Sequence, residues 1–237
     1  MAETSGPVAF IPARGGSRRI PRKNLRPILG VPALRRVLDV VTAAQTFDRV
    51  VVSSDDEEIL ALAAQVPGVE TLRRPSALAD DHTTFTEVVR DFATTCAPEV
   101  SAVAAFVATA VSLQNDDIHR VLAVARSGRW EFVFTAGALD VPVERTLTQD
   151  SEGGCRMHDP RHFSTRSQDL PRSYRDAGMI YVGAPDAWRS GAAIFTERST
   201  FIEIPRWRVH DLDTEEDWQY AERVLGAHGM TKDRGLD

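Results

Sequence analysis

Short apolar runs alternate with segments in which apolar residues recur every three or four positions along most of the chain. The short runs are typical of buried strands, and the wider spacing is typical of helices with one apolar face. Strand and helix alternate in this way up to about residue 136, which predicts an α/β fold with a mostly parallel sheet and helices on both faces. The expected strands are 8–12, 49–54, 69–72, 102–109, 131–136, 177–183 and 201–204, with an extended segment at 207–209, and the expected helices are 32–44, 57–66, 84–95, 186–191, 214–226 and one that begins at 115.

Three of these helices begin at residues that can satisfy unpaired backbone N–H groups. Thr84 with Glu87, and Thr214 with Asp217, have the spacing of a capping box, in which each side chain accepts a hydrogen bond from the other residue's backbone. Asn115 is expected to cap the helix that follows it.

The alternation is interrupted between about residues 140 and 175. This stretch is polar, rich in arginine, broken by Gly153-Gly154 and by prolines, and has no helix of convincing length. We expect it to be an arm that leaves the sheet, inserted within a single domain spanning residues 1–237. The tail from Ala227 is expected to fray.

Charge and cysteine content limit the partners and the setting. The chain has 28 Lys and Arg against 34 Asp and Glu, and this net charge of −6 opposes a nucleic-acid partner. The longest apolar run, 100–111, is shorter than the roughly 20 residues needed to span a bilayer, so no membrane partner is expected. Cys96 and Cys155 lie far apart and form no metal-type or disulfide framework, which favours the cytoplasm.

The loop 13–24, directly after the first predicted strand, concentrates basic residues and glycine. Gly15 and Gly16 allow a tight bend in which N–H groups converge on phosphate oxygens, and Arg14 and Lys23 supply full positive charges. Ligands of open α/β sheets bind at the carboxyl ends of strands, where this loop begins. The loop has neither the Walker A nor the Rossmann glycine pattern. A solvated basic loop with no ligand is the alternative.

Asp211 and Asp213 form a second candidate site. In an extended segment these two carboxylates lie on one face, and such pairs are typical ligands of Mg²⁺, which also binds substrate phosphates. The alternative is that both interact with the dipole of the following helix. The presence of the basic loop favours the metal.

Arginines are frequent around the segment 166–171, where they can present planar donors to a carboxylate. A salt-bridged surface arm is the alternative. Asp55 either faces a nucleotide or, with Asp56, caps the next helix. No Gly-x-Ser-x-Gly elbow indicates a serine hydrolase.

Several motifs in a fixed order together resemble the CMP-sialic acid synthetase family over about residues 7–226. The similar segments are Ile11–Ser17, Ile20–Asn24, Val51–Asp55, Arg74–Pro75, Leu78–Asp81, Arg166–Pro171, Asp176–Gly178 and Asp211–Thr214. Details such as Tyr174–Gly178 and Ile204–Trp207 resemble the branch that acts on pseudaminic acid. The sialic acid enzymes usually carry Gln-Pro-Thr-Ser-Pro where this chain has Val107–Val111. Arg18 occupies a position at which the family usually has Lys. Met179, close to the expected sugar pocket, occupies a position at which the pseudaminic branch more often has Gln.

The resemblance implies a Rossmann-like nucleotide-diphospho-sugar transferase fold and a set of site residues. Asp211 and Asp213 match the magnesium ligands, and with Arg14 and Lys23 they form the expected catalytic group. The arm 140–175 matches the element through which these enzymes form homodimers, with the partner's arm over the active site. The expected nucleotide-binding residues are Ala13, Arg14, Gly15, Gly16, Ser17, Lys23, Asn24, Asp80, Thr83 and Thr109, and the expected sugar-binding residues are Arg145, Arg166, Gln168 and Asp176.

The implied reaction joins CTP to a nine-carbon acidic sugar. The C2 hydroxyl of a nonulosonic acid, pseudaminic acid in particular, attacks the α-phosphorus of CTP and diphosphate leaves. The alternatives are synthetases of CMP-N-acetylneuraminate, CMP-legionaminate or CMP-KDO. Two alternatives lie outside this class of enzyme. One is a non-catalytic nucleotide-binding regulator, and the other is an RNA-binding protein, which the net charge disfavours.

Overall fold

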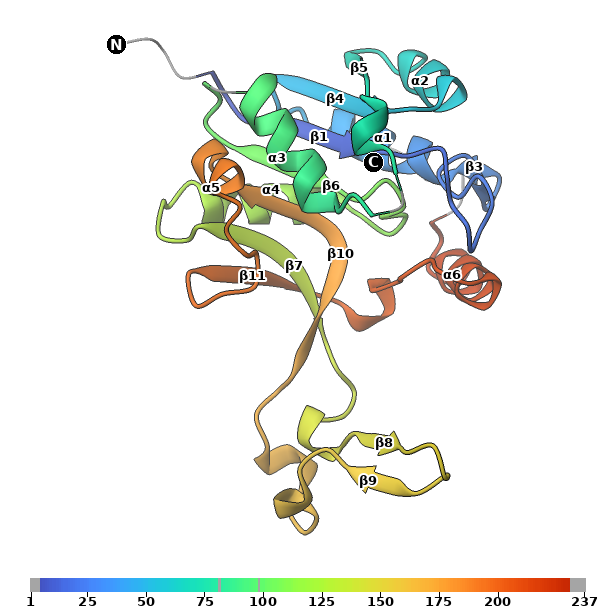
Figure 1. Cartoon of the computed structure of the whole chain (residues 1–237), viewed down its shortest axis with the longest axis vertical. Coiled ribbons are helices and arrows are strands. Elements are labelled where there is room, and N and C mark those ends of the chain that lie inside the picture. Colours follow the sequence, from blue (N-terminus) through green and yellow to red (C-terminus); the bar gives the residue numbers. More distant parts are fainter. Residues whose placement is uncertain (1–4, 81, 98, 231–237) are drawn as a thin grey trace.

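A seven-stranded sheet organises the chain, in the order β11-β7-β10-β6-β1-β4-β5 (Figure 1). The computed structural model describes residues 5–80, 82–97 and 99–230, so Asp81 of the motif 78–81 and the tail beyond residue 230 lie outside the described residues. The sheet strands are β1 (Val8–Pro12), β4 (Arg49–Ser54), β5 (Val69–Arg73), β6 (Val103–Phe106), β7 (Phe132–Ala138), β10 (Tyr174–Gly183) and β11 (Ser199–Ile204). The helices are α1 (Ala33–Ala43), α2 (Glu57–Ala64), α3 (Phe85–Thr95), α4 (Asn115–Ala125), α5 (Pro185–Ser190) and α6 (Glu215–Ala227).

The predicted mostly parallel α/β sheet is confirmed. β1 runs parallel to β4 and β6, β4 to β5, and β11 to β7. Only β10 is antiparallel to its neighbours in this sheet, β6 and β7. The exception follows from connectivity, because the chain passes from β7 to β10 through the arm instead of a crossover helix, and a parallel pair needs a crossover.

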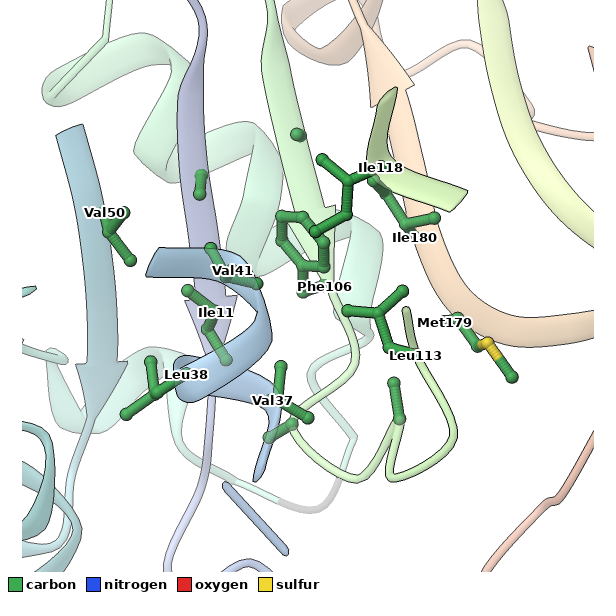
Figure 2. Close-up of a cluster of buried hydrophobic side chains, with 14 of the residues drawn as sticks. Ile11, Val37, Leu38, Val41, Val50, Phe106, Leu113, Ile118, Met179 and Ile180 are labelled. Atoms are coloured by element: carbon green, nitrogen blue, oxygen red, sulfur yellow. The ribbon is translucent and has the colours of Figure 1, made fainter. Parts of the chain in front are cut away.

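Helices cover both faces of the sheet, each over an apolar cluster. On one face, α1, α2 and α4 pack Leu38, Ile59 and Ile118 against the sheet; Figure 2 shows part of this cluster, including Met179 and Ile180. On the other face, α3 and α5 contribute Phe92 and Trp188. Each fully buried side chain of this size contributes about 1.5–3 kcal/mol relative to exposure, so both layers are fixed mainly by burial.

A third apolar cluster lies away from the sheet and holds α6. Ile20 and Ile28 of the first loop region pack with Leu212, Trp218 and Leu225. Arg26 adds a cation–π contact to Trp218 and a paired hydrogen bond to Glu215 at 2.6 and 2.7 Å. β2 (Pro27–Ile28) pairs with β3 (Val31–Pro32), and in the turn between them Leu29 N donates to Glu222 Oε1 of α6 at 3.1 Å. The C-terminal helix is therefore attached to the same loop region that carries the predicted phosphate site.

Most element boundaries agree with the sequence, and two capping boxes are confirmed at Thr84–Glu87 and Thr214–Asp217. Asn115 is not the cap of α4: Gln114 is, with Asp117 accepting from its N–H at 3.0 Å. The predicted strand 102–109 ends at Phe106, because the following residues turn through bonds such as Ala110 N to Val107 O at 3.0 Å. The segment 207–209 is not extended, since η5 (Arg206–Arg208) is a 3₁₀ turn.

Residues between β7 and β10 project from the sheet as an arm (Figure 1). It holds a hairpin of β8 (Leu147–Gln149) and β9 (Cys155–Met157) and the 3₁₀ turns η2 (Val143–Arg145), η3 (Pro160–His162) and η4 (Ser167–Asp169). η1 (Ser76–Leu78) lies in the body. The arm exposes apolar side chains, with Leu147 at 66% and Phe163 at 78% of their surface.

Within the described part of the chain, every helix is too short or too polar to cross a membrane.

Candidate active site

A cavity of about 420 Å³ lies where β1 and β6 end at their carboxyl sides, close to the loop predicted to hold phosphates. Side chains from this loop, from the turn after β6 and from the first turn of α3 surround it. Of the expected nucleotide-binding residues, Arg14, Gly16, Ser17, Lys23, Asn24 and Thr109 line the cavity. The remaining lining residues are Pro12, Arg18, Arg19, Phe85, Val107 and Ala108.

The loop is held in place by backbone contacts that orient its basic side chains. Ala13 is buried at 1% exposure, and its N–H donates to Ser53 O at 2.9 Å, so it supports the cavity from beneath. Asn24 Nδ2 donates to Arg14 O at 2.9 Å and closes the loop on itself. Gly15 N donates to Asp55 Oδ1 at 3.0 Å, whereas Asp56 caps α2. The structure thereby distinguishes the roles of the two aspartates: Asp55 holds the backbone of the loop, and Asp56 caps the helix.

Asp80 and Thr83 lie next to Arg14, but their polar atoms are already engaged with each other. Arg14 Nη1 approaches Asp80 O at 3.4 Å. Asp80 Oδ1 accepts from both the N–H and the hydroxyl of Thr83 at 2.7 Å, and these bonds hold the pKa of Asp80 below its usual range. Neither residue lines the cavity. Their placement favours a role in shaping the loop around Arg14.

A buried arginine beneath the loop was not among the expected site residues. Arg74 is 6% exposed and donates to Ser53 O at 2.8 Å. Burial lowers the pKa of Arg74, nearby Asp55 opposes this effect, and Arg14 adds to it. A cation placed so close to Arg14 increases the positive potential of the cavity. The sequence signal was Arg74-Pro75, which is part of the family resemblance.

The two aspartates of the second candidate site meet the basic loop. Lys23 Nζ donates to Leu212 O at 2.9 Å and to Asp213 Oδ1 at 3.3 Å, and Arg19 Nη1 lies 2.6 Å from Asp213 Oδ2. Partial burial and the charge of Asp213 raise the pKa of Asp211, against the opposing charges of Lys23 and Arg19. The cost of burying the charged form of Asp211, together with the charge of Asp213, therefore outweighs the attraction of the two nearby cations.

The donor set around this pair fits a metal ion shared with a substrate. Among the described residues, no group of three or more His, Cys, Asp or Glu side chains is arranged to hold a metal. Mg²⁺ does not need one, since it is usually bound through one or two carboxylates, waters and substrate phosphates. Asp211 and Asp213 meet that requirement.

Tyr181 is bonded to Asp176 and lies close enough to Asp211 to be affected by its charge. The Tyr181 hydroxyl donates to Asp176, across an irregularity in the pairing of β10 with β7. Burial, Asp176 and Asp211 together raise the pKa of Tyr181, so the phenol remains protonated. Phe85, which lines the cavity, has its ring centre 5.5 Å from that of Tyr181. Tyr181 therefore packs against the wall of the site without lining the cavity, and it was not predicted from the sequence.

The Met179 side chain, expected close to the sugar pocket, does not line the cavity. Met179 is 1% exposed and packs in the core on the face covered by α1 and α4 (Figure 2). Val111 is also buried, in the cluster that holds α6. In a regular strand Met179 and Tyr181 would share a face, but β10 is irregular between Asp176 and Tyr181, and Tyr181 lies on the face opposite to Met179.

Aromatic rings continue from Tyr181 toward the edge of the sheet. The ring of Phe134 lies 6.3 Å from Tyr181, 5.1 Å from Phe195 and 5.9 Å from Phe201. Phe195 is 61% exposed. These rings form an aromatic wall that meets the carboxylates of the site at Tyr181, which is bonded to Asp176.

The expected sugar-binding residues of the arm do not join this cavity within one chain. Arg145 is exposed and donates to Thr165 O at 2.8 Å inside the arm. Arg166 and Gln168 are exposed at η4. None of them lines the cavity, and Figure 1 shows the arm directed away from the sheet. Of the four expected sugar contacts, only Asp176 is near the site.

Comparison with known proteins agrees with the geometry of the site. A family described as cytidylyltransferase matches residues 8–220. The pseudaminic acid cytidylyltransferase of Campylobacter jejuni is 34% identical over 217 residues, which cover 90% of this chain and 94% of the relative. An N-acylneuraminate cytidylyltransferase B of Danio rerio is 29% identical over 226 residues, covering 92% of this chain and 51% of the relative.

Solved structures support the fold. A CMP:2-keto-3-deoxy-manno-octonic acid synthetase complexed with CTP superposes with a TM-score of 0.71 at 16% identity, covering 94% of this chain and all of the other. A 4-diphosphocytidyl-2C-methyl-D-erythritol synthase of Anaerococcus prevotii gives a TM-score of 0.64 at 13% identity, covering 94% of this chain and 100% of the other. The Rossmann-like fold of CTP-dependent nucleotidyltransferases is thus confirmed. On the strength of the match over residues 8–220, this chain belongs to the cytidylyltransferase family.

Proposed function

We propose that this protein transfers CMP from CTP to the C2 hydroxyl of a nonulosonic acid, pseudaminic acid in particular, and releases diphosphate. The observation that carries the proposal is the contact between Lys23 of the basic loop and Asp213 of the carboxylate pair. This contact joins a loop cation that lines the cavity to one of the two carboxylates expected to hold a metal, which supports the proposal. The similarity to the pseudaminic acid cytidylyltransferase of Campylobacter jejuni supports the choice of sugar.

The loop would bind the triphosphate through full charges and backbone donors. Arg14 and Lys23 line the cavity, and Arg74 adds positive potential from beneath. Gly16 and Ser17 also line it, which leaves their backbone open to phosphate oxygens. When diphosphate leaves, these groups would stabilise the charge that develops on it.

The chemistry requires positioning more than covalent help from the protein. In-line attack by a hydroxyl on phosphorus is accelerated when both reactants are held in contact and charge is stabilised. Asp211 and Asp213 would hold Mg²⁺, which when bound withdraws charge from the phosphates and acidifies a nearby hydroxyl. No side chain is assigned as a general base.

The sugar would lie between Asp176 and the aromatic wall. Asp176 is held by the Tyr181 hydroxyl and presents its carboxylate to sugar hydroxyls, whereas Phe195 offers apolar surface to acyl and methyl substituents. The sugar carboxylate needs a cation, and the arginines of the arm are the candidates. Since they do not reach the cavity of their own chain, we propose a homodimer in which each arm completes the partner's site.

Exposed apolar residues on the arm support such a dimer. Leu147 and Phe163 are exposed at 66% and 78%, and burying such large apolar side chains against a second chain would be favourable. We place the protein in the cytoplasm, where Cys96 and Cys155, which form no disulfide, would be kept reduced.

The proposal is tested by diphosphate release from CTP and pseudaminic acid. Asp211→Asn and Asp213→Asn should each lower kcat/KM by about 100-fold or more, the effect of removing a group that stabilises phosphate charge. Asp39→Asn is the matched control. Asp39 pairs with Arg35 on the surface of α1, so this variant should leave the rate unchanged. Full activity in both site variants, or CTP binding by the wild type without turnover of any sugar, would reject the enzyme in favour of a nucleotide-binding regulator.

A further inference from the structure

Arg19 stands between the cavity and the carboxylate pair. It lines the cavity together with Arg14 and Lys23, and its Nη1 lies 2.6 Å from Asp213 Oδ2. Its side chain is 68% exposed, whereas that of Asp213 is only 24% exposed. An exposed cation is thus directed onto a half-buried carboxylate at the centre of the site.

The two cations on Asp213 are held very differently. Lys23 is 22% exposed and is anchored by Leu212 O at 2.9 Å, so it stays in place whether or not it also contacts Asp213 Oδ1. Arg19 pairs with Asp213 through a side chain that is 68% exposed, and the charges of Asp211 and Asp217 also act on it. Exposed ion pairs contribute about 1 kcal/mol at most, so this contact breaks readily when a better anion arrives.

The contact has a consequence for metal binding. Each oxygen of Asp213 faces a cation, Oδ1 facing Lys23 and Oδ2 facing Arg19. A divalent ion that binds a carboxylate needs a free oxygen at close range. Arg19 therefore competes with such an ion for Asp213.

We propose that Arg19 alternates between two anions, holding Asp213 in the empty site and moving to the triphosphate when CTP binds. Guanidinium groups bind phosphate oxygens in paired geometry, and Arg19 already lines the cavity proposed for the triphosphate. Its departure frees Asp213 Oδ2 for the metal. The inference rests on the proposed function, since it takes Asp213 as a metal ligand and the cavity as the CTP site.

This arrangement couples the two ligands. Binding of CTP removes a competitor of the metal, and by thermodynamic reciprocity a metal at Asp213 releases Arg19 for the nucleotide. A metal ion would then bind the nucleotide-free protein weakly and the nucleotide-bound protein tightly, beyond the attraction between metal and phosphate themselves.

The test measures each ligand alone on the full chain. Mn²⁺ binding to nucleotide-free protein is followed by loss of the free-ion signal in electron paramagnetic resonance, and CTP binding is followed by calorimetry in EDTA. Arg19→Gln should bind Mn²⁺ up to about 5-fold more tightly than the wild type, the equivalent of an exposed ion pair, and CTP several-fold more weakly. A general disturbance of the fold is not expected to raise the affinity for one ligand and lower the affinity for the other.

Two variants serve as controls. Arg19→Lys keeps the charge and should stay close to the wild type with both ligands. Arg22→Gln removes another exposed arginine of the loop, one that pairs with Glu58 at 2.5 Å and does not line the cavity, and should change neither affinity.

The failure of the inference is distinguishable from that of the proposed function. If Arg19→Gln binds Mn²⁺ no more tightly than the wild type, or binds CTP equally well, the alternation is overturned while the enzyme assignment stands. If Asp213→Asn binds Mn²⁺ as the wild type does, or neither the wild type nor Arg19→Gln binds it, the metal assignment fails and the inference fails with it. Turnover of CTP with sugar then decides separately whether the protein is a transferase.

Discussion

Arg208 and Asp117 form an ion pair that is almost completely excluded from solvent, at 3% and 0% exposure. Arg208 Nη1 donates to Asp117 Oδ1 at 3.1 Å, and a second bond joins Nη2 to Oδ2. Arg208 Nε also donates to Ser112 O at 3.0 Å, and Ser112 Oγ donates back to Arg208 O at 2.5 Å. The chain that leads to Asp211 and Asp213 is thereby tied to the turn that carries Thr109.

Breaking this pair should cost far more than breaking a surface pair. Asp117→Asn leaves a buried guanidinium without its counter-charge, which typically costs about 3–5 kcal/mol. The neighbouring Asp116→Asn removes a carboxylate that is 74% exposed and 3.6 Å from Arg120, with an expected cost below about 1 kcal/mol. Urea unfolding measures both, and equal losses would contradict the structural role given to Arg208.

Gly15 and Gly16 should respond differently to alanine. A Cβ on Gly15 would lie 2.7 Å from both Cβ and Oδ2 of Asp56, the cap of α2, whereas one on Gly16 meets nothing within 4 Å. Gly15→Ala should therefore destabilise the protein by about 1–3 kcal/mol, as overpacking does. Gly16→Ala should stay within about 0.5 kcal/mol.

The same pair of variants also tests the ligand site. Since Gly16 lines the cavity proposed for the triphosphate, Gly16→Ala should weaken CTP binding in calorimetry without loss of stability. Undiminished CTP affinity in this variant would place the triphosphate elsewhere.

Asp217 gives the stability a specific dependence on pH. Its carboxylate accepts hydrogen bonds from Thr214 Oγ1 at 2.7 Å, Thr214 N at 2.8 Å and Asp213 N at 3.3 Å. These bonds lower the pKa of Asp217, and the bond from the Thr214 hydroxyl has the largest effect. A lowered pKa means stability that is present above the ordinary aspartate value of about 3.9 and is lost as the pH falls through the lowered value.

Asp217→Ala should therefore lower the free energy of unfolding by about 1 kcal/mol at pH 7, the usual contribution of a cap. The difference from the wild type should shrink at pH values below about 3.9. Glu216→Ala is the control, because Glu216 is exposed in the same first turn and makes no capping bond. A loss that is independent of pH, or equal in both variants, would remove Asp217 from this role.

The arms are expected to act in trans. Arg166→Ala and Asp211→Asn should each inactivate the homodimer, one through the arm and one through the body. Co-expressed with different tags, they should recover activity in about a quarter of the sites, because only a mixed dimer joins an intact body to an intact partner arm. A mixture as inactive as its components, or a monomer in light scattering, would contradict the shared site.

Local patterns were sufficient to predict the layers of the fold and the meeting of the loop with the carboxylates. Val50, Val51 and Val52 specify a buried strand, and Thr84 with Glu87 specifies a helix start, because both depend on neighbours in sequence. The parallel sheet then brings the carboxyl ends of its strands to one edge, which is why the loop, Phe85 and Thr109 meet.

What sequence did not predict depends on contacts between distant segments. Gln114 caps α4 because Asp117 is fixed by Arg208, 91 residues away. Tyr181 faces the site and Met179 the opposite core through the irregular pairing of β10, which no local pattern encodes. The contact proposed between Arg166 and an active site requires a second chain. The sequence of one chain predicts such a contact only through its resemblance to the family.

Transfer of CMP to pseudaminic acid is best tested by comparing sugars as substrates of the wild-type protein. Diphosphate release at saturating CTP and Mg²⁺ gives kcat/KM for pseudaminic acid, N-acetylneuraminic acid, legionaminic acid and KDO. Pseudaminic acid should exceed each of the others by at least about 10-fold, equivalent to about 1.4 kcal/mol of transition-state discrimination. Equal or faster turnover of any other sugar, or no diphosphate with any of them, would contradict the account.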